Sequence, residues 1–199
     1  MFFSFIFIVF HTVAISASTN IGTSLHPVYN YNTIPSHIHG ALKKRAYITS
    51  NSNCSDSEAS KIHAALKSCA QLASWGFHAV QSNNQLFKLI FKTDSTDIQD
   101  LVKSNFNEIY RECSRETDEV SITCRDIGAQ KCVRDGVHAL GYARIPYKQV
   151  IICPTFFNKP ASSREATAGN QDTVILHEIA HIVLDTYEDY GYEWEGISK

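Results

Sequence analysis

The stretch HEIAHIVLDTYEDYGY, His177 to Tyr192, lies near the end of a chain of 199 residues and decides how the rest is interpreted. Its first five residues place two histidines at i and i+4, with a glutamate directly after the first. On a helix this spacing puts His177 and His181 on one face, one turn apart, where both imidazoles reach a single Zn²⁺. Glu178 then lies on the same side, where it can take a proton from a water that the metal activates. The pattern predicts a metal-dependent hydrolytic site.

The residues around this pattern favour a functional site over a structural one. A match to H-E-x-x-H arises by chance in a chain of this length at roughly the few-per-cent level, so the pattern needs support from its surroundings. The alternative is a core helix with two hydrogen-bonded histidines. The flanking residues 173–176 and 182–184 are mostly apolar, which indicates a buried helix and a site with little water.

The third metal ligand has to come from the residues after His181. On a continuing helix Asp185 shares its face, but it lies roughly 9 Å along the axis from a metal held between the two histidines. A short aspartate side chain does not cover that distance. The pattern H-E-x-x-H-x-x-G-x-x-H fails as well, because Leu184 and Tyr187 stand where it requires glycine and histidine. The chain must therefore turn back after His181 before it supplies a ligand.

The acidic residues beyond that point are the remaining candidates, namely Glu188, Asp189, Glu193 and Glu195. Asp189 is followed by Tyr190-Gly191-Tyr192, a turn-forming sequence that can bring a tyrosine hydroxyl beside the metal. A phenol there would hydrogen-bond the oxyanion as a tetrahedral intermediate forms. Asp189 and Tyr192 are therefore the pair of interest.

The N-terminus predicts a signal peptide over residues 1–17. Phe2–Val9 is apolar, the run continues more weakly to Ile15, and small residues suited to cleavage lead to Ala17. Such a run is too short to span a bilayer comfortably, and no second apolar run follows it. We therefore expect a secreted, extracellular protein without stable membrane association. A signal anchor is the alternative.

Residues 18–45 predict a propeptide. The segment is rich in Ser, Thr, Asn, His and Pro and ends in Lys43-Lys44-Arg45, a site suited to a dibasic-specific protease, although such a run can also be a solvated surface. Cleavage after Arg45 leaves residues 46–199 as the mature domain, which is long enough for one packed core. Three of the 18 basic residues and none of the 20 acidic ones precede this domain, so its formal charge is 15 − 20 = −5. That charge argues against a nucleic-acid partner.

All six cysteines lie in the predicted mature domain, at Cys54, Cys69, Cys113, Cys124, Cys132 and Cys153. An even count behind a signal peptide is typical of a disulfide framework, here with three bridges. A cysteine-based metal site is the alternative, but the chain contains no C-x-x-C pair.

Hydrophobic periodicity predicts helices in the first part of this domain. A capping-box spacing starts a helix at Ser55, and apolar residues recur at helical spacing up to about Trp75. A shorter helical piece covers residues 85–91, and a further helix runs from about Asp94 to Cys113. Cys69 and Cys113 lie on the apolar faces of the two longer helices, which is compatible with a bridge between them.

The second part predicts short strands and a final helix. Residues 119–124, 137–145 and 149–153 are β-branched and aromatic segments separated by Gly, Pro and Lys. A loop over residues 161–171 leads to the helix that carries the two histidines. Helices, a small antiparallel sheet and a last helix together predict an α+β fold.

HEIAH, followed by Asp189 and Tyr192, resembles the deuterolysin family of secreted fungal zinc proteases, the aspzincins. Their signature is HExxH followed by GTxDxxYG, with the Asp as third zinc ligand and the Tyr as transition-state donor. The resemblance implies a zincin-like domain in which His177, His181 and Asp189 bind one Zn²⁺. It also implies that Glu178 activates the water and that Tyr192 stabilises the oxyanion.

The resemblance extends more loosely over most of the predicted mature domain. Residues 53–76 look like the family's N-terminal helix after its first cysteine, and residues 124–153 look like its small sheet with two bridges. By this analogy Cys54 pairs with Cys124 and Cys132 pairs with Cys153, and the two cysteines on the helix faces, Cys69 and Cys113, pair with each other.

The sequence departs from the family pattern in several places. Thr186-Tyr187 replaces the GT of the signature, Glu193 replaces its closing Gly, and the spacing from His181 to Asp189 is shorter than in the family. Family members carry a longer propeptide and continue with a further helix that walls the substrate cleft, whereas this chain stops at Lys199. We expect either a truncated gene product or a reduced family member.

The sequence therefore predicts a secreted, monomeric zinc metalloendopeptidase that is made as a preproprotein and hydrolyses peptide bonds. The resemblance implies protein or peptide substrates, and an acidic domain is compatible with basic ones. The alternative is a secreted zinc-binding effector or interaction protein that keeps the site with weak turnover or none, which the short C-terminus favours.

Overall fold

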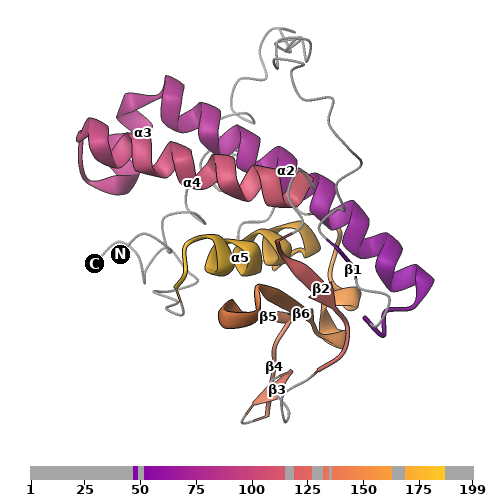
Figure 1. The fold of residues 1–199 in the computed structure, drawn as a ribbon. Helices are drawn as coiled ribbons and strands as arrows, with labels where there is room; N and C mark the ends of the chain where they lie inside the picture. The colour runs from indigo at the N-terminus through magenta and orange to yellow at the C-terminus, as the bar shows by residue number, and fades with distance from the viewer. Residues whose placement is uncertain are drawn as a thin grey trace, which may run out of the picture.

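A computed structural model describes residues 47–48, 52–114, 119–126, 132–134, 136–162 and 169–186. These residues form an α+β fold, which confirms the predicted class (Figure 1). The predicted signal peptide and propeptide, with their cleavage sites at Ala17 and Arg45, lie outside the described residues. So do the predicted site residues Asp189 and Tyr192. None of the helices in the described ranges is long and apolar enough to cross a membrane.

The first long helix, α2 (Asp56–Ser82), begins at the predicted capping box. The Ser55 hydroxyl accepts from the Glu58 N–H at 3.3 Å, and the Ser55 N–H donates to the Glu58 carboxylate at 2.8 Å. The helix is longer than predicted, because its buried stripe continues past Trp75 through Gly76 and Val80. Trp75 is 55% exposed and Gly76 is a weak helix former, so the pattern alone did not show this extension.

α2 packs against α4 (Thr96–Ser114), with the short α3 (Asn84–Phe91) between them in sequence. The Cys69–Cys113 disulfide joins the two helices near one end of the contact. Near the other end, the Gln99 side chain donates to the Val80 carbonyl at 2.7 Å. The middle of α2 therefore lies beside the end of α4, and the end of α2 lies beside the start of α4, so the two helices run antiparallel.

The larger sheet of the described chain is mixed, so the prediction of an antiparallel sheet is wrong in part. Its strand order is β1 (Tyr47–Ile48), β2 (Ser121–Thr123), β6 (Gln149–Ile152) and β5 (Gly141–Arg144). β1–β2 and β2–β6 pair in parallel, and only β5–β6 is antiparallel. The connections explain this, because a tight turn favours an antiparallel pair and a parallel pair needs a long crossover. The three helices form the crossover from β1 to β2, and the short 3₁₀ turn Ile145–Tyr147 joins β5 to β6.

A separate two-stranded hairpin, β3 (Val133–Arg134) and β4 (Val137–His138), projects from the sheet (Figure 1). The segment predicted as one strand over residues 137–145 is therefore split into β4 and β5. The Cys132–Cys153 disulfide ties the base of the hairpin to the end of β6. The main chain turns tightly at Gly136, whose φ of +79° suits a residue without a side chain.

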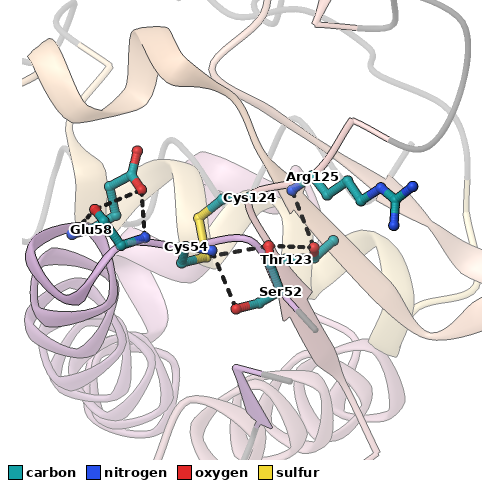
Figure 2. The surroundings of a disulfide bond; sticks show 7 residues. Ser52, Cys54, Glu58, Thr123, Cys124 and Arg125 are labelled. Atoms are coloured by element: carbon teal, nitrogen blue, oxygen red, sulfur yellow. Dashed lines mark hydrogen bonds between the residues drawn. A yellow bond between two sulfur atoms is a disulfide. The ribbon is translucent and has the colours of Figure 1, made fainter. Parts of the chain in front are cut away.

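The third disulfide, Cys54–Cys124, joins the start of α2 to the end of β2 (Figure 2). Around it the Ser52 carbonyl accepts from the Thr123 hydroxyl and from the Cys124 N–H, both at 2.8 Å. The structure thus holds the three pairs that the family resemblance implies, with no free cysteine among the described residues. Together they connect the helix pair, the sheet and the hairpin.

The last helix, α5 (Gln171–Val183), lies between the α2–α4 pair and the sheet (Figure 1). Its apolar side chains join one core with residues of α2, α4, β2 and β6. Its first turn is anchored to the chain after β6: the Gln171 N–H donates to the Pro160 carbonyl at 3.0 Å, and the Asp172 N–H donates to the Ala161 carbonyl at 3.3 Å. The Gln171 side chain adds a bond to the Lys159 carbonyl at 2.9 Å. These contacts fix the start of the helix that carries the site.

Gly76 provides a test of the close packing between α2 and α4. A Cβ at this position would lie 2.5 Å from Cε1 of the buried Phe106 ring. We expect Gly76→Ala to lower the free energy of unfolding by about 1–3 kcal/mol, the usual cost of overpacking a core. This exceeds the gain of roughly 0.5–1 kcal/mol that alanine brings to a helix interior.

Urea denaturation measures the change, with the exposed Gln71→Ala on the same helix as a control that should leave the stability within about 0.5 kcal/mol. Phe106→Leu in the Gly76→Ala background should recover part of the loss. A stabilising Gly76→Ala would contradict the close approach of the two helices.

Asp172, in the first turn of α5, provides a test of electrostatics. It is buried, and this burial raises the pKa of its carboxyl group, although the Thr173 N–H partly offsets the effect by donating to it at 2.8 Å. The folded state therefore binds this proton more tightly than the unfolded state. The resulting stability is present below the unfolded pKa of about 3.9 and is lost as the pH rises through the raised folded pKa.

Asp172→Asn keeps an acceptor oxygen and removes the charge, so we expect the variant to be more stable than the wild type at neutral pH. The difference should vanish in acid, where the wild-type carboxyl is protonated. Urea denaturation series across this pH range measure both effects. A variant that is less stable at neutral pH would show that the folded state favours the charged form.

Candidate metal centre

α5 presents His177, Glu178 and His181 within two turns of one helix. His181 and Glu178 are buried, with 6% and 7% of their surfaces exposed, and His177 is half-buried. Polar side chains on a buried helix need strong partners, because leaving them unsatisfied is costly. The three residues on which the sequence prediction rests therefore lie inside the domain.

The two imidazoles converge on one point. Their Nε2 atoms lie 3.0 Å apart, and the rings are nearly perpendicular with centroids 4.5 Å apart. Two nitrogens bound at about 2.0–2.1 Å to a tetrahedral Zn²⁺ lie roughly 3.3 Å from each other. The pair is therefore already arranged as two ligands of one metal ion require.

The hydrogen bond on the other side of His181 defines its tautomer. His181 Nδ1 lies 2.8 Å from the Thr186 carbonyl oxygen, which can only accept. Nδ1 therefore carries the hydrogen, and in the neutral ring Nε2 directs a lone pair toward His177. His181 Nε2 is therefore an acceptor in the 3.0 Å contact with His177 Nε2. Either the N–H of His177 or a cation shared by both rings has to lie between the two nitrogens. Metal-binding histidines use this arrangement, with a second partner that orients the ring.

Glu178 packs against the edge strand β5. A Cβ added to Gly141 would lie 3.4 Å from Glu178 Cγ and 3.0 Å from the Ile151 carbonyl oxygen. The close approach to the Ile151 carbonyl favours a residue without a side chain at this position, and Glu178 lies at ordinary contact distance beside it. The sequence reasoning missed Gly141, although an isolated glycine in a strand segment is a known sign that another group approaches closely.

α5 ends directly after the second histidine. The Thr186 N–H donates to the His181 carbonyl at 3.1 Å, the Asp185 N–H donates to the Ile182 carbonyl at 3.4 Å, and Asp185 has a φ of +49°. These bonds and the left-handed residue form a Schellman motif, which stops a helix and redirects the chain. The sequence required a turn at this point, but it did not show that the turn also holds the ring of His181.

The described residues do not supply a third ligand. No group of three His, Cys, Asp or Glu side chains suited to a metal occurs among them, and Asp185 is exposed beyond the helix end. The argument against Asp185 assumed a continuing helix, whereas the structure places this residue in the turn after α5. Asp189 and Tyr192 follow the described part of the chain.

Comparison with known proteins relates this site to a family. The sequence model of the aspzincin family, described as lysine-specific metallo-endopeptidases, matches residues 77–199. A neutral protease 2 homolog of Pyricularia oryzae is 31% identical over 194 residues, which cover 91% of this chain and 54% of the relative. A neutral protease 2 homolog of Phaeosphaeria nodorum is 34% identical over 159 residues, which cover 77% of this chain and 43% of the relative.

The chain spans about half the length of these curated relatives. The part matched by the family model contains the whole of α5, with both converging histidines and the buried glutamate. This chain therefore belongs to the aspzincin family of metallo-endopeptidases, the deuterolysin type.

Proposed function

We propose that this protein is a secreted zinc-dependent metalloendopeptidase that hydrolyses peptide bonds in proteins. The convergence of two histidine Nε2 atoms, 3.0 Å apart on the helix that also carries the buried Glu178, is the observation that carries the proposal. Membership of a metallo-endopeptidase family and the names of the curated relatives support the same chemistry. Three disulfides are compatible with an extracellular protein.

His177, His181 and Asp189 are the proposed ligands of one Zn²⁺. A zinc ion bound there supplies Lewis-acid chemistry, because it polarises the substrate carbonyl and acidifies water. The reach of the chain supports Asp189 as the third ligand. Three residues extend at most about 11 Å, so a ligand three positions after Thr186 would need only a short connection to the end of α5. The Thr186 carbonyl in turn contacts the ring of His181.

Glu178 is the proposed general base. Its carboxylate takes a proton from the attacking water and passes it to the leaving amine, which turns a poor leaving group into a good one. Burial and the contact with Gly141 limit the positions that its side chain can adopt. The Tyr192 hydroxyl is the proposed donor to the oxyanion.

The edge strand β5 is the proposed binding site for the substrate backbone. β5 lies at one end of the described sheet, and its residue Gly141 lies beside Glu178. An extended peptide that adds to this edge would pass close to the general base. The family description names lysine-specific cleavage, and the charge of −5 on residues 46–199 is compatible with basic substrates.

Replacing Glu178 by alanine tests catalysis separately from metal binding. We expect hydrolysis of casein by Glu178→Ala to fall by about 10²–10⁴-fold, the usual contribution of a general base, because no other group replaces the carboxylate. Zinc content, measured by atomic absorption in both proteins, should stay near one ion per chain.

The two measurements separate the proposed enzyme from a zinc-binding protein without turnover. Zinc in both proteins and equal, negligible hydrolysis would favour the non-catalytic alternative. Equal and substantial hydrolysis would remove Glu178 from the mechanism, and an absence of zinc from both proteins would contradict the metal site itself.

The third ligand is tested by comparing three acidic positions. We expect Asp189→Ala to weaken zinc binding far more than Asp185→Asn or Glu188→Ala, because only Asp189 matches the family signature. Competition with a chelating dye measures the three affinities under the same conditions. If Glu188→Ala loses as much zinc affinity as Asp189→Ala, the assignment of Asp189 as the third ligand is wrong.

A further inference from the structure

We infer that Asp185 is a positioning residue for the metal centre, and that it acts through its backbone conformation and not through its carboxylate. This inference rests on the proposed function, because it concerns how His181 is held for the metal. Asp185 occupies the left-handed position of the turn that ends α5, and the next residue, Thr186, supplies the carbonyl that accepts from His181 Nδ1. The helix end and the metal ligand are thus parts of one unit.

The bonds of this unit form a closed loop. The Thr186 N–H donates to the His181 backbone carbonyl at 3.1 Å, and the His181 ring N–H donates to the Thr186 carbonyl at 2.8 Å. These two bonds therefore join Thr186 to the same histidine. They form together only if residue 185 has a positive φ, because that conformation brings the chain back over the last turn of the helix.

The conformation of residue 185 then controls which nitrogen of His181 faces the metal. While the Thr186 carbonyl stays within hydrogen-bond distance, the ring keeps its hydrogen on Nδ1 and its lone pair on Nε2, and it cannot rotate freely. If the turn opens, the ring loses this partner. The hydrogen can then move to Nε2, the atom that has to bind the metal.

Residue types differ in how well they adopt a positive φ. Glycine adopts it without strain, and asparagine and aspartate tolerate it, whereas a β-branched side chain is strongly disfavoured there. The side chain of Asp185 is exposed, so substitutions at this position change the turn without disturbing the core. The position can therefore be tested with a graded set of variants.

The experiment compares Asp185→Gly, Asp185→Asn and Asp185→Val in the full chain. Glycine and asparagine remove the carboxylate but keep the turn, and valine removes the carboxylate and strains the turn. We expect zinc affinity, measured by dye competition, to be retained in the first two variants. In Asp185→Val it should fall about tenfold or more, the usual effect of losing the partner of a metal-binding histidine.

A second measurement uses the metal-free protein and needs no activity. Nitrogen-15 NMR of the imidazoles, at a pH where they are neutral, reports the tautomer of His181. We expect the Nδ1–H form in the wild type and in the glycine and asparagine variants, and a shift toward the Nε2–H form in Asp185→Val. Hydrogen exchange at the Thr186 amide should accelerate in the same variant only.

The outcomes separate this inference from the proposed function. Zinc binding of equal strength in all three variants, with an unchanged tautomer, would overturn the inference and leave the metal site intact. Equal losses in all three would show that the carboxylate itself acts, which also overturns it. If the wild type binds no zinc, the proposed function fails, while the tautomer series still decides whether residue 185 holds the ring. Should Asp185→Val fold poorly, Asp185→Thr provides the same β-branched test.

Discussion

The burial of α5 between the helix pair and the sheet is the constraint on which the candidate site depends. A helix covered on both sides cannot shift along its axis or rotate without breaking contacts to α2, α4 and β5 at once. Its start is fixed by bonds to the Pro160–Ala161 segment, and its end by the turn at Asp185. Two imidazoles one turn apart are therefore held at a constant separation.

The same burial means that the polar side chains of α5 lower the stability of the fold relative to apolar ones. A core helix is most stable when its buried positions are apolar, yet Glu178 and His181 are both buried in α5. The surrounding residues adapt to them, since Gly141 lies beside the glutamate and the Thr186 carbonyl accepts from the histidine. Such accommodation of polar groups in a core is expected where they serve a chemical purpose.

The sequence predicted the elements whose signals are local. The capping box at Ser55 marks the start of α2, and hydrophobic periodicity places the other helices and the main strand segments within a few residues, although it ends α2 too early. The family resemblance implied the disulfide pairs that the structure contains. These features depend on side chains that are close in sequence or on a shared family pattern.

The features that the sequence did not predict depend on contacts between distant segments. The parallel direction of β2 and β6 follows from how the chain returns to the sheet, which strand propensity does not encode. The last part of α2 contacts a distant segment, because the Phe106 ring of α4 packs over Gly76. The role of Thr186 was hidden because it acts through its backbone carbonyl, which every residue possesses.

The turn at Asp185 also bears on the spacing that departs from the family pattern. The sequence comparison leads us to expect fewer residues between His181 and Asp189 than in the family pattern, and a chain that continued as a helix would carry those residues away from the histidines by about 1.5 Å each. A Schellman motif reverses this direction within two residues of the helix end. An early reversal shortens the path that a third ligand has to cover, so a shorter segment can serve the same purpose. The spacing and the turn are therefore linked: with this turn a short segment is compatible with the proposed three-ligand site, whereas a continuing helix would carry the chain away from the two histidines.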